Sequence, residues 1–396
     1  MKHNRMITPE GMKDILLEEC TLRRTLREKA ASRLRRSGYR EVVTPGVEFY
    51  DLFDPSHTGF AQEDLYKMTD NKGRLLVMRP DCTLPIARLA ATRLQALPRP
   101  LRLWYDEMVY RNNPGLDGRD DEQLQCGMEL LGAGGLKADL EALFLASRIL
   151  QDMVPGYRIE LGHAGIFQGL SEELPVDDEG REAIRRAIEA KNYAALSAML
   201  DEIPDTPAVQ ALQKLPRLFG GPEVLHEARA LCGGSRASEA LSYLQNLYEK
   251  LCDLGLSDHV MFDLGLVQRN DYYTGVVFSA YIPGEGEAVL SGGRYDSLLD
   301  WFGQPMPAVG FALKIDAVAR SLMREQGMVC PAPQLLVFGE KGQETKALLY
   351  MQDRQEKGVV CEYAVCETME QAKDYAIRSG IHRLAIVSEQ VREVEV

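Results

Sequence analysis

Two polar residues in one short loop, Asp81 and Thr83, carry groups that can hold an ammonium ion. They stand on either side of Cys82, so a carboxylate and a hydroxyl can accept hydrogen bonds from the same positively charged group. An aspartate just before a helix more often caps that helix. The loop therefore indicates a ligand site only in combination with other polar residues.

Gln125 and Glu129 are four residues apart in a segment whose pattern predicts a strand, so we expect both on one face. Apolar residues surround Glu129, which places its carboxylate in an apolar layer where it needs a partner. An imidazole N–H suits this carboxylate. A structural arginine would serve equally well.

Tyr272 and Tyr273 place two hydroxyl-bearing rings next to each other in the sequence. On a strand the two rings face opposite sides, so at most one lines a pocket unless the backbone turns. By itself the pair is more typical of core packing. The glycine-rich segment 292–296 could form a phosphate-binding nest, but a tight strand-to-helix turn explains it equally well.

Composition is ordinary for a globular protein of two or three domains: 396 residues, 45% hydrophobic and 27% charged. The 46 Lys and Arg against 59 Asp and Glu give a net charge of −13. Because a protein that neutralises many phosphates normally has a basic face, this balance argues against a nucleic-acid partner.

The eight cysteines form no Cys-x-x-Cys motif, and the six histidines do not cluster near them. We therefore expect reduced thiols, a cytoplasmic location and no metal site. No apolar run approaches the roughly 20 residues that span a bilayer, so we expect no membrane association. P-loop, Gly-x-Ser-x-Gly and His-Glu-x-x-His motifs are missing from the sequence.

Apolar periodicity predicts the elements that would carry these motifs. Leu22, Leu26, Ala30 and Leu34 recur at fourfold spacing, which predicts a helix with one apolar face that ends at Gly38. Further patterns predict strands at 39–44, 74–79, 101–111 and 122–131, the last two as a hairpin, and helices from about 84 and at 137–152.

The stretch from about 168 to 252 is rich in Glu, Ala, Leu and Arg and predicts a helical insertion. Strand patterns return at 259–266, 272–281 and 287–291, and a strand and helix follow at 308–323. A Pro-Ala-Pro linker then leads to a small, acidic α/β domain at 331–396, with strands at 334–339, 359–365 and 383–388.

In this order the segments resemble histidyl-tRNA synthetase over roughly residues 5–325. Segment 8–14 resembles that family's opening segment, 79–83 its amino-acid loop with Asp81 in place of a glutamate, and 110–129 its motif 2 loop. Segment 268–275 resembles the histidine-recognition segment, and 292–317 the approach to motif 3. The resemblance implies an α+β class II synthetase-like core at 1–325, with a mixed, mostly antiparallel sheet flanked by helices.

The resemblance also implies a set of histidine-binding residues. Glu129 and Tyr273 would read the imidazole, Asp81, Thr83 and Gln125 would hold the amino group, and Arg111 would hold the carboxylate. The full set is Asp81, Thr83, Arg111, Gln125, Glu129, Tyr272 and Tyr273. Buried polar partners of this kind discriminate strongly against side chains that cannot hydrogen-bond.

Four positions depart from the synthetase pattern at residues that would hold ATP. Asn113 replaces a glutamate that binds adenine, Asp121 reverses the charge of an arginine, Gln268 replaces the catalytic arginine, and Ala317 replaces the motif 3 arginine. Arginine grips phosphate through a bidentate fork that other side chains do not reproduce. One such donor is worth about a hundredfold in rate, so these losses argue decisively against adenylation.

This combination resembles the regulatory subunits of ATP phosphoribosyltransferase. It implies a protein that is not an enzyme and needs no cofactor. It would form a homodimer, activate a short catalytic subunit and mediate feedback inhibition by histidine, without binding tRNA; the 331–396 domain resembles a shortened anticodon-binding domain. Two alternatives stay open: a divergent, active histidyl-tRNA synthetase, and a free-standing histidine sensor.

Overall fold

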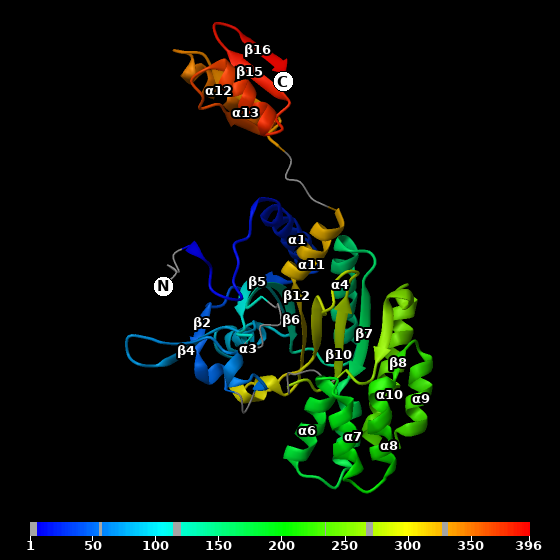
Figure 1. Ribbon diagram of the computed structural model, residues 1–396. Helices are drawn as coiled ribbons and strands as arrows, with labels where there is room; N and C mark the ends of the chain where they lie inside the picture. The colour runs from blue at the N-terminus through cyan, green and yellow to red at the C-terminus, as the bar shows by residue number, and fades with distance from the viewer. Residues whose placement is uncertain (1–5, 55–57, 114–119, 234, 267–271, 327–331) are drawn as a thin grey trace. The chain divides into compact units, whose positions relative to one another are not determined.

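The computed structural model describes residues 6–54, 58–113, 120–233, 235–266, 272–326 and 332–396. The chain divides into two compact units, residues 1–327 and 328–396 (Figure 1). Within the described residues, no helix is both long and apolar enough to cross a membrane.

A nine-stranded mixed sheet forms the centre of the larger unit, and its strand order is β1-β5-β6-β12-β11-β10-β7-β9-β8. The pairs β1–β5 and β7–β9 are parallel and the other pairs are antiparallel. The strands are β1 (Arg40–Glu41), β5 (Leu101–Tyr110), β6 (Glu122–Leu131), β7 (Arg158–His163), β8 (Phe219–Gly220), β9 (Val260–Asp263), β10 (Val276–Tyr281), β11 (Leu290–Arg294) and β12 (Ala308–Lys314). This confirms the predicted fold class.

Three helices pack against one another and against the strands at one end of this sheet. They are α1 (Leu17–Arg36), α4 (Leu136–Met153) and α11 (Ile315–Gln326), and they contact β5, β6, β11 and β12. The apolar face predicted for α1 is confirmed, because Leu22, Leu26, Ala30 and Leu34 are all buried. The helices therefore support the β5–β6 hairpin and β12, which carry part of the candidate site.

A smaller antiparallel sheet, of order β2-β4-β3, packs with α3 (Thr83–Thr92) and short 3-10 turns into a second apolar core. Its strands are β2 (Val47–Phe49), β3 (Lys67–Thr69) and β4 (Leu75–Met78), and the turns are η2 (Tyr50–Phe53), η3 (Gln62–Asp64) and η6 (Leu298–Phe302). Phe53, Leu84 and Ile86 are fully buried there. This core fixes the loop that carries Asp81.

The expected helical insertion consists of α5 (Ala164–Glu172), α6 (Asp178–Glu189), α7 (Tyr193–Asp201), α8 (Pro207–Lys214), α9 (Glu223–Leu231) and α10 (Ser235–Asp253), with turns η4 (Leu215–Arg217) and η5 (Ser257–His259). Side chains of Asp177, Asn192 and Thr206 cap α6, α7 and α8 by accepting backbone N–H bonds.

The smaller unit has a four-stranded sheet of order β14-β13-β15-β16 with helices α12 (Glu344–Glu356) and α13 (Met369–Arg378). The strands are β13 (Leu335–Gly339), β14 (Cys361–Tyr363), β15 (Arg383–Val387) and β16 (Val391–Glu395). Successive residues of β13 enter opposite cores, as the strand period requires: Leu336 on one face, Leu335 and Val337 on the other. The sequence pattern missed β16, in which three of the five residues are charged.

Three predicted boundaries were wrong in ways that affect the site. The 39–44 strand is only two residues long, β1. The 272–281 strand begins at Val276, because residues 272–275 form a turn. The glycines at 292 and 293 lie inside β11, paired with β10 and β12, rather than in a nest or turn.

Candidate functional site

A cavity of about 290 Å³ lies where α3, the β5–β6 hairpin, β11 and β12 meet. Six predicted ligand residues line it: Asp81, Thr83, Arg111, Gln125, Tyr272 and Tyr273. The seventh, Glu129, lies behind two lining residues, Thr83 and Tyr295, and bonds to both. Residues from five separate segments thus meet at one place.

Asp81 is 5% exposed. One of its carboxylate oxygens accepts a hydrogen bond and the other has no hydrogen-bond partner. Its Oδ1 accepts the backbone N–H of Leu84 at 3.3 Å, the capping contact that the sequence left open. Its Oδ2 has no hydrogen-bond partner. Burial raises the pKa of Asp81 to about 6, and the charge of Arg111 partly opposes the rise. An unpaired buried oxygen in a cavity is costly unless a donor arrives.

Glu129 is 1% exposed and accepts two hydroxyl hydrogen bonds. Thr83 Oγ1 donates to Oε1 at 2.8 Å, and the Tyr295 hydroxyl donates to Oε2. The Glu129 carboxylate is therefore paired with two hydroxyl groups rather than with a structural arginine. Burial raises the pKa of Glu129 to about 8, against the opposing effect of these two bonds.

Gly310 of β12 lies opposite Glu129 of β6 in the antiparallel register. A Cβ at position 310 would lie 1.8 Å from Glu129 Oε2 and 2.6 Å from the Met128 carbonyl oxygen. Only a glycine leaves room for the carboxylate in this place.

Arg111 follows the end of β5 and is held from two sides. Its Nε donates to the Pro80 carbonyl at 2.8 Å, and its guanidinium lies 5.3 Å from the centre of the Phe60 ring. Its backbone N–H donates to the Asp121 carbonyl at 2.8 Å. The guanidinium faces the same cavity as Asp81, so one positive and one negative group are available to a ligand.

Tyr272 and Tyr273 both line the cavity, which is the outcome expected if the backbone turns here rather than continuing as a strand. The backbone turns here, and the two ring centres are only 5.0 Å apart. The Tyr272 ring also packs edge to face on Tyr295, with centres 5.7 Å apart. Burial raises the pKa of each of these three tyrosines, so their hydroxyls are donors at neutral pH.

Sequence reasoning missed several lining residues, most of which lie on elements that carry no predicted ligand residue. Tyr295 was noted only as part of the glycine-rich segment. The others are Cys82, Tyr105, Glu189, Ser279, Ser291, Gly310, Phe311 and Ala312. Alternation along β5 and β12 shows which residues share a face with Tyr105 and Gly310. It does not show that this face meets the cavity unless the pairing of the strands is known.

Two of the positions that depart from the synthetase pattern, Asn113 and Asp121, have internal hydrogen-bond partners. The Asp121 carboxylate accepts from the Tyr66 hydroxyl and, at 2.8 Å, from Asn113 Nδ2. Ala317 is buried in α11, next to Asp316, which pairs with Arg23 at 2.6 Å. Gln268 lies outside the described residues. Among the described residues, no three His, Cys, Asp or Glu side chains gather in a way that could hold a metal ion.

The fold and the gathered residues define a histidyl-tRNA synthetase-like protein. A model of the histidyl-tRNA synthetase family matches residues 11–318. The structure of a histidyl-tRNA synthetase from Nostoc sp. PCC 7120 matches with a TM-score of 0.78 over 99% of this chain and 97% of its own. At 18% identity that match shows the shared fold.

Closer matches define the family. An ATP phosphoribosyltransferase regulatory subunit from Clostridium botulinum (strain 657 / Type Ba4) is 35% identical over 378 residues, 94% of this chain and 90% of its own length. A crystal structure of an ATP phosphoribosyltransferase regulatory subunit/histidyl-tRNA synthetase from Bacillus halodurans matches at 29% identity with a TM-score of 0.86, covering 98% and 99% of the two chains. The chain belongs to the ATP phosphoribosyltransferase regulatory subunit family.

Proposed function

We propose that this protein is a non-catalytic regulatory subunit that binds free histidine in the cavity and controls a separate, short ATP phosphoribosyltransferase chain. The family assignment supports a regulatory role. The observation that carries the histidine proposal is the unpaired, buried Asp81 oxygen in a cavity that also presents Arg111 and adjoins Glu129.

Each polar group of histidine has a matching group here. The ammonium group pairs with Asp81, assisted by Thr83 and Gln125, and fills the vacant place on Oδ2. The carboxylate pairs with the Arg111 guanidinium. The imidazole lies beside the Tyr272 and Tyr273 rings and donates its N–H to Glu129, whose oxygens keep acceptor capacity after the bonds from Thr83 and Tyr295.

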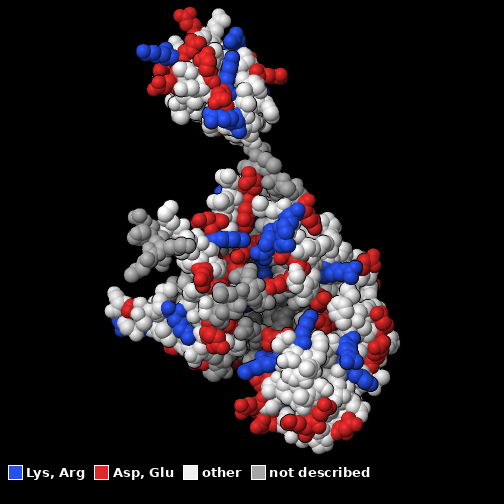
Figure 2. Space-filling view, in the orientation of Figure 1, with Lys and Arg blue, Asp and Glu red and all other residues white. Residues whose placement is uncertain are grey.

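A role in adenylation is disfavoured by the three described positions that depart from the synthetase pattern. Asn113 and Asp121 are bonded to each other, and the Ala317 side chain has no donor for phosphate. We therefore favour the regulatory-subunit hypothesis over the hypothesis of a divergent, active synthetase. Binding of tRNA is also disfavoured: on the face shown in Figure 2, basic side chains of the described residues are interspersed with acidic ones and form no continuous basic surface.

Self-association is supported by a row of apolar side chains on the three-stranded sheet β2-β4-β3. Val47, Phe49, Met68, Leu76 and Met78 share one face in the pairing register, and the first three are 39%, 47% and 38% exposed. We propose that this row, close to α1 in sequence, is buried in a homodimer. We place this assembly in the cytoplasm.

Histidine regulates the partner only if it binds the inhibited arrangement of the complex more tightly than the active one. The coupling is reciprocal, so the catalytic chain must in turn change the affinity of this protein for histidine. A free-standing sensor shows no such change. This difference separates the two proposals that share a histidine site.

Calorimetric titration with three ligands tests the site itself. Histidine should bind, whereas histidinol, which lacks the carboxylate, and imidazolepropionate, which lacks the ammonium group, should each bind at least about tenfold more weakly, about 1.4 kcal/mol per lost pair. Arg111→Gln should abolish the discrimination against histidinol. Equal binding of all three ligands would refute the assignment of Asp81 and Arg111.

A further inference from the structure

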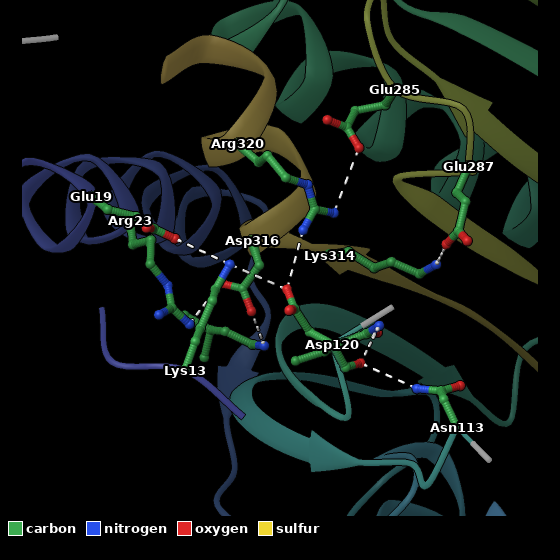
Figure 3. A network of polar contacts seen from close by, with 12 residues as sticks. Lys13, Glu19, Arg23, Asn113, Asp120, Glu285, Glu287, Lys314, Asp316 and Arg320 are labelled. Atoms are coloured by element: carbon green, nitrogen blue, oxygen red, sulfur yellow. Dashed lines mark hydrogen bonds and ion pairs between the residues drawn. The ribbon is translucent and has the colours of Figure 1, made fainter. Parts of the chain in front are cut away.

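An ionic network includes Lys314, which also lines the cavity (Figure 3). It brings together five basic and five acidic side chains from the N-terminal segment, α1, the β5–β6 hairpin, the segment after β10, β12 and α11. The basic members are Lys13, Arg23, Lys314, Arg320 and Arg324, and the acidic members are Glu19, Asp120, Glu285, Glu287 and Asp316.

Asp120 lies at the centre of the network. It is 3.2 Å from Lys13 Nζ and 3.1 Å from Arg320 Nη1, so one carboxylate joins the N-terminal segment to α11. Arg320 also approaches Glu285 at 3.6 Å, and Arg324 pairs with the same carboxylate. The Glu285 side chain is only 7% exposed, so its charge is poorly screened.

Two further pairs flank this centre. Arg23 of α1 pairs with Asp316 at 2.6 Å, and Asp316 Oδ2 also accepts the Leu124 backbone N–H at 2.7 Å. Lys314, which lines the cavity, lies 3.6 Å from Glu287. Every basic member of the network is therefore within ion-pair distance of an acidic member.

Five cations gathered beside a cavity are the usual means of holding a polyphosphate. Here a polyphosphate would have to displace the carboxylates from the same cations, and it would meet their negative charge at close range. Two effects thus act together: the attractive charges are already neutralised, and the repulsive charges are held in place by the fold.

We propose that this network is a polyphosphate cradle closed by its own carboxylates, which keep nucleotides and inorganic polyphosphates away from the cavity. The cavity is then left to small ligands without phosphate. The exclusion is a property of the free chain and does not depend on histidine binding or on a partner.

Removing two of the carboxylates should open the cradle. The probe is inorganic triphosphate, titrated calorimetrically into the full chain at low salt. The wild-type protein should bind it weakly, and Asp120→Asn/Glu285→Gln should bind it at least tenfold more tightly. The gain should fall as salt is added, because freed cations are screened. Asp120→Asn alone should show a smaller gain and serves if the double variant does not fold.

The matched control is Asp70→Asn/Asp152→Asn, which removes the same net charge from two ion pairs elsewhere, with Arg74 and Arg33. It should bind triphosphate as the wild-type protein does. The proposal is overturned if the wild-type protein already binds triphosphate as tightly as the Asp120 variants do. It is equally overturned if those variants gain nothing, or if the control gains as much as they do.

Discussion

Gly310 faces Glu129 across neighbouring strands at a separation that excludes even one methyl group. The carboxylate occupies the space that a side chain at position 310 would fill, and Thr83 and Tyr295 hold it there. Strand pairing, rather than any local motif, therefore creates the room for the buried acid at the inner end of the cavity.

Gly310→Ala should displace the Glu129 carboxylate, because the new Cβ would lie 1.8 Å from Oε2. We expect at least a tenfold loss of histidine affinity and a loss of about 1–3 kcal/mol in the free energy of unfolding. Calorimetry and urea unfolding measure the two effects. Gly286→Ala is the control, since a Cβ there meets no atom within 4 Å. Unchanged affinity in Gly310→Ala would remove Glu129 from the site.

Glu129→Gln should change how stability depends on pH. The pKa of Glu129 rises from 4.5 to about 8 on folding, so the folded protein holds a proton that the unfolded chain has lost between these pH values. Ionisation therefore destabilises the wild-type fold progressively as pH rises through this window. Glutamine does not ionise and avoids this loss.

We expect the Tm of Glu129→Gln, measured without ligand, to lie near or below that of the wild-type protein at pH 5. At pH 8.5 it should have gained a few degrees relative to the wild type. All other titrating groups are common to both proteins. A difference in Tm that stays constant from pH 5 to 9 would contradict the buried, proton-holding state of Glu129.

Asp139→Asn should destabilise the larger unit strongly. Asp139 is fully buried in α4, pairs with Arg294 at 2.5 Å and accepts the Tyr243 hydroxyl of α10. Removing one partner of a buried pair leaves the other charge uncompensated, which costs about 3–5 kcal/mol. Urea unfolding measures this cost. Asp152→Asn, in a pair whose side chains are each 36% exposed, should cost about 1 kcal/mol or less.

Phe49→Lys/Met68→Lys should prevent self-association by placing charge on the apolar row of the three-stranded sheet. Sedimentation velocity at micromolar concentration measures the outcome: a dimer for the wild-type protein and a monomer for the variant. The control is Tyr193→Lys, which replaces an aromatic side chain on α7 that is 47% exposed. This variant should remain dimeric. A variant that stays dimeric would place the interface elsewhere.

Local sequence patterns predicted those helices and strands whose own residues show a clear hydrophobic pattern. The apolar spacing of Leu22, Leu26, Ala30 and Leu34 predicted α1. Two strand patterns on either side of a polar loop predicted the β5–β6 hairpin, with Glu129 in an apolar layer. The family resemblance added the shared cavity of six residues. The role of each of these residues in binding stays a prediction.

What the sequence missed depends on contacts between distant segments. Tyr295 is 166 residues from Glu129, and nothing near either residue indicates their bond. The edge-to-face contact of the Tyr272 ring with Tyr295 likewise has no signal near either residue. The ionic network was missed for the same reason: Asp120 and Arg320, which form its centre, are 200 residues apart.

The most direct test of the regulatory account is the rate at which the matching short catalytic chain forms phosphoribosyl-ATP, with and without this protein, across a histidine titration. We predict that this protein raises the rate and that histidine then lowers it, while Gly310→Ala retains the activation and loses the inhibition. If this protein changes neither the rate nor its sensitivity to histidine, the regulatory account is wrong and the free-standing sensor replaces it.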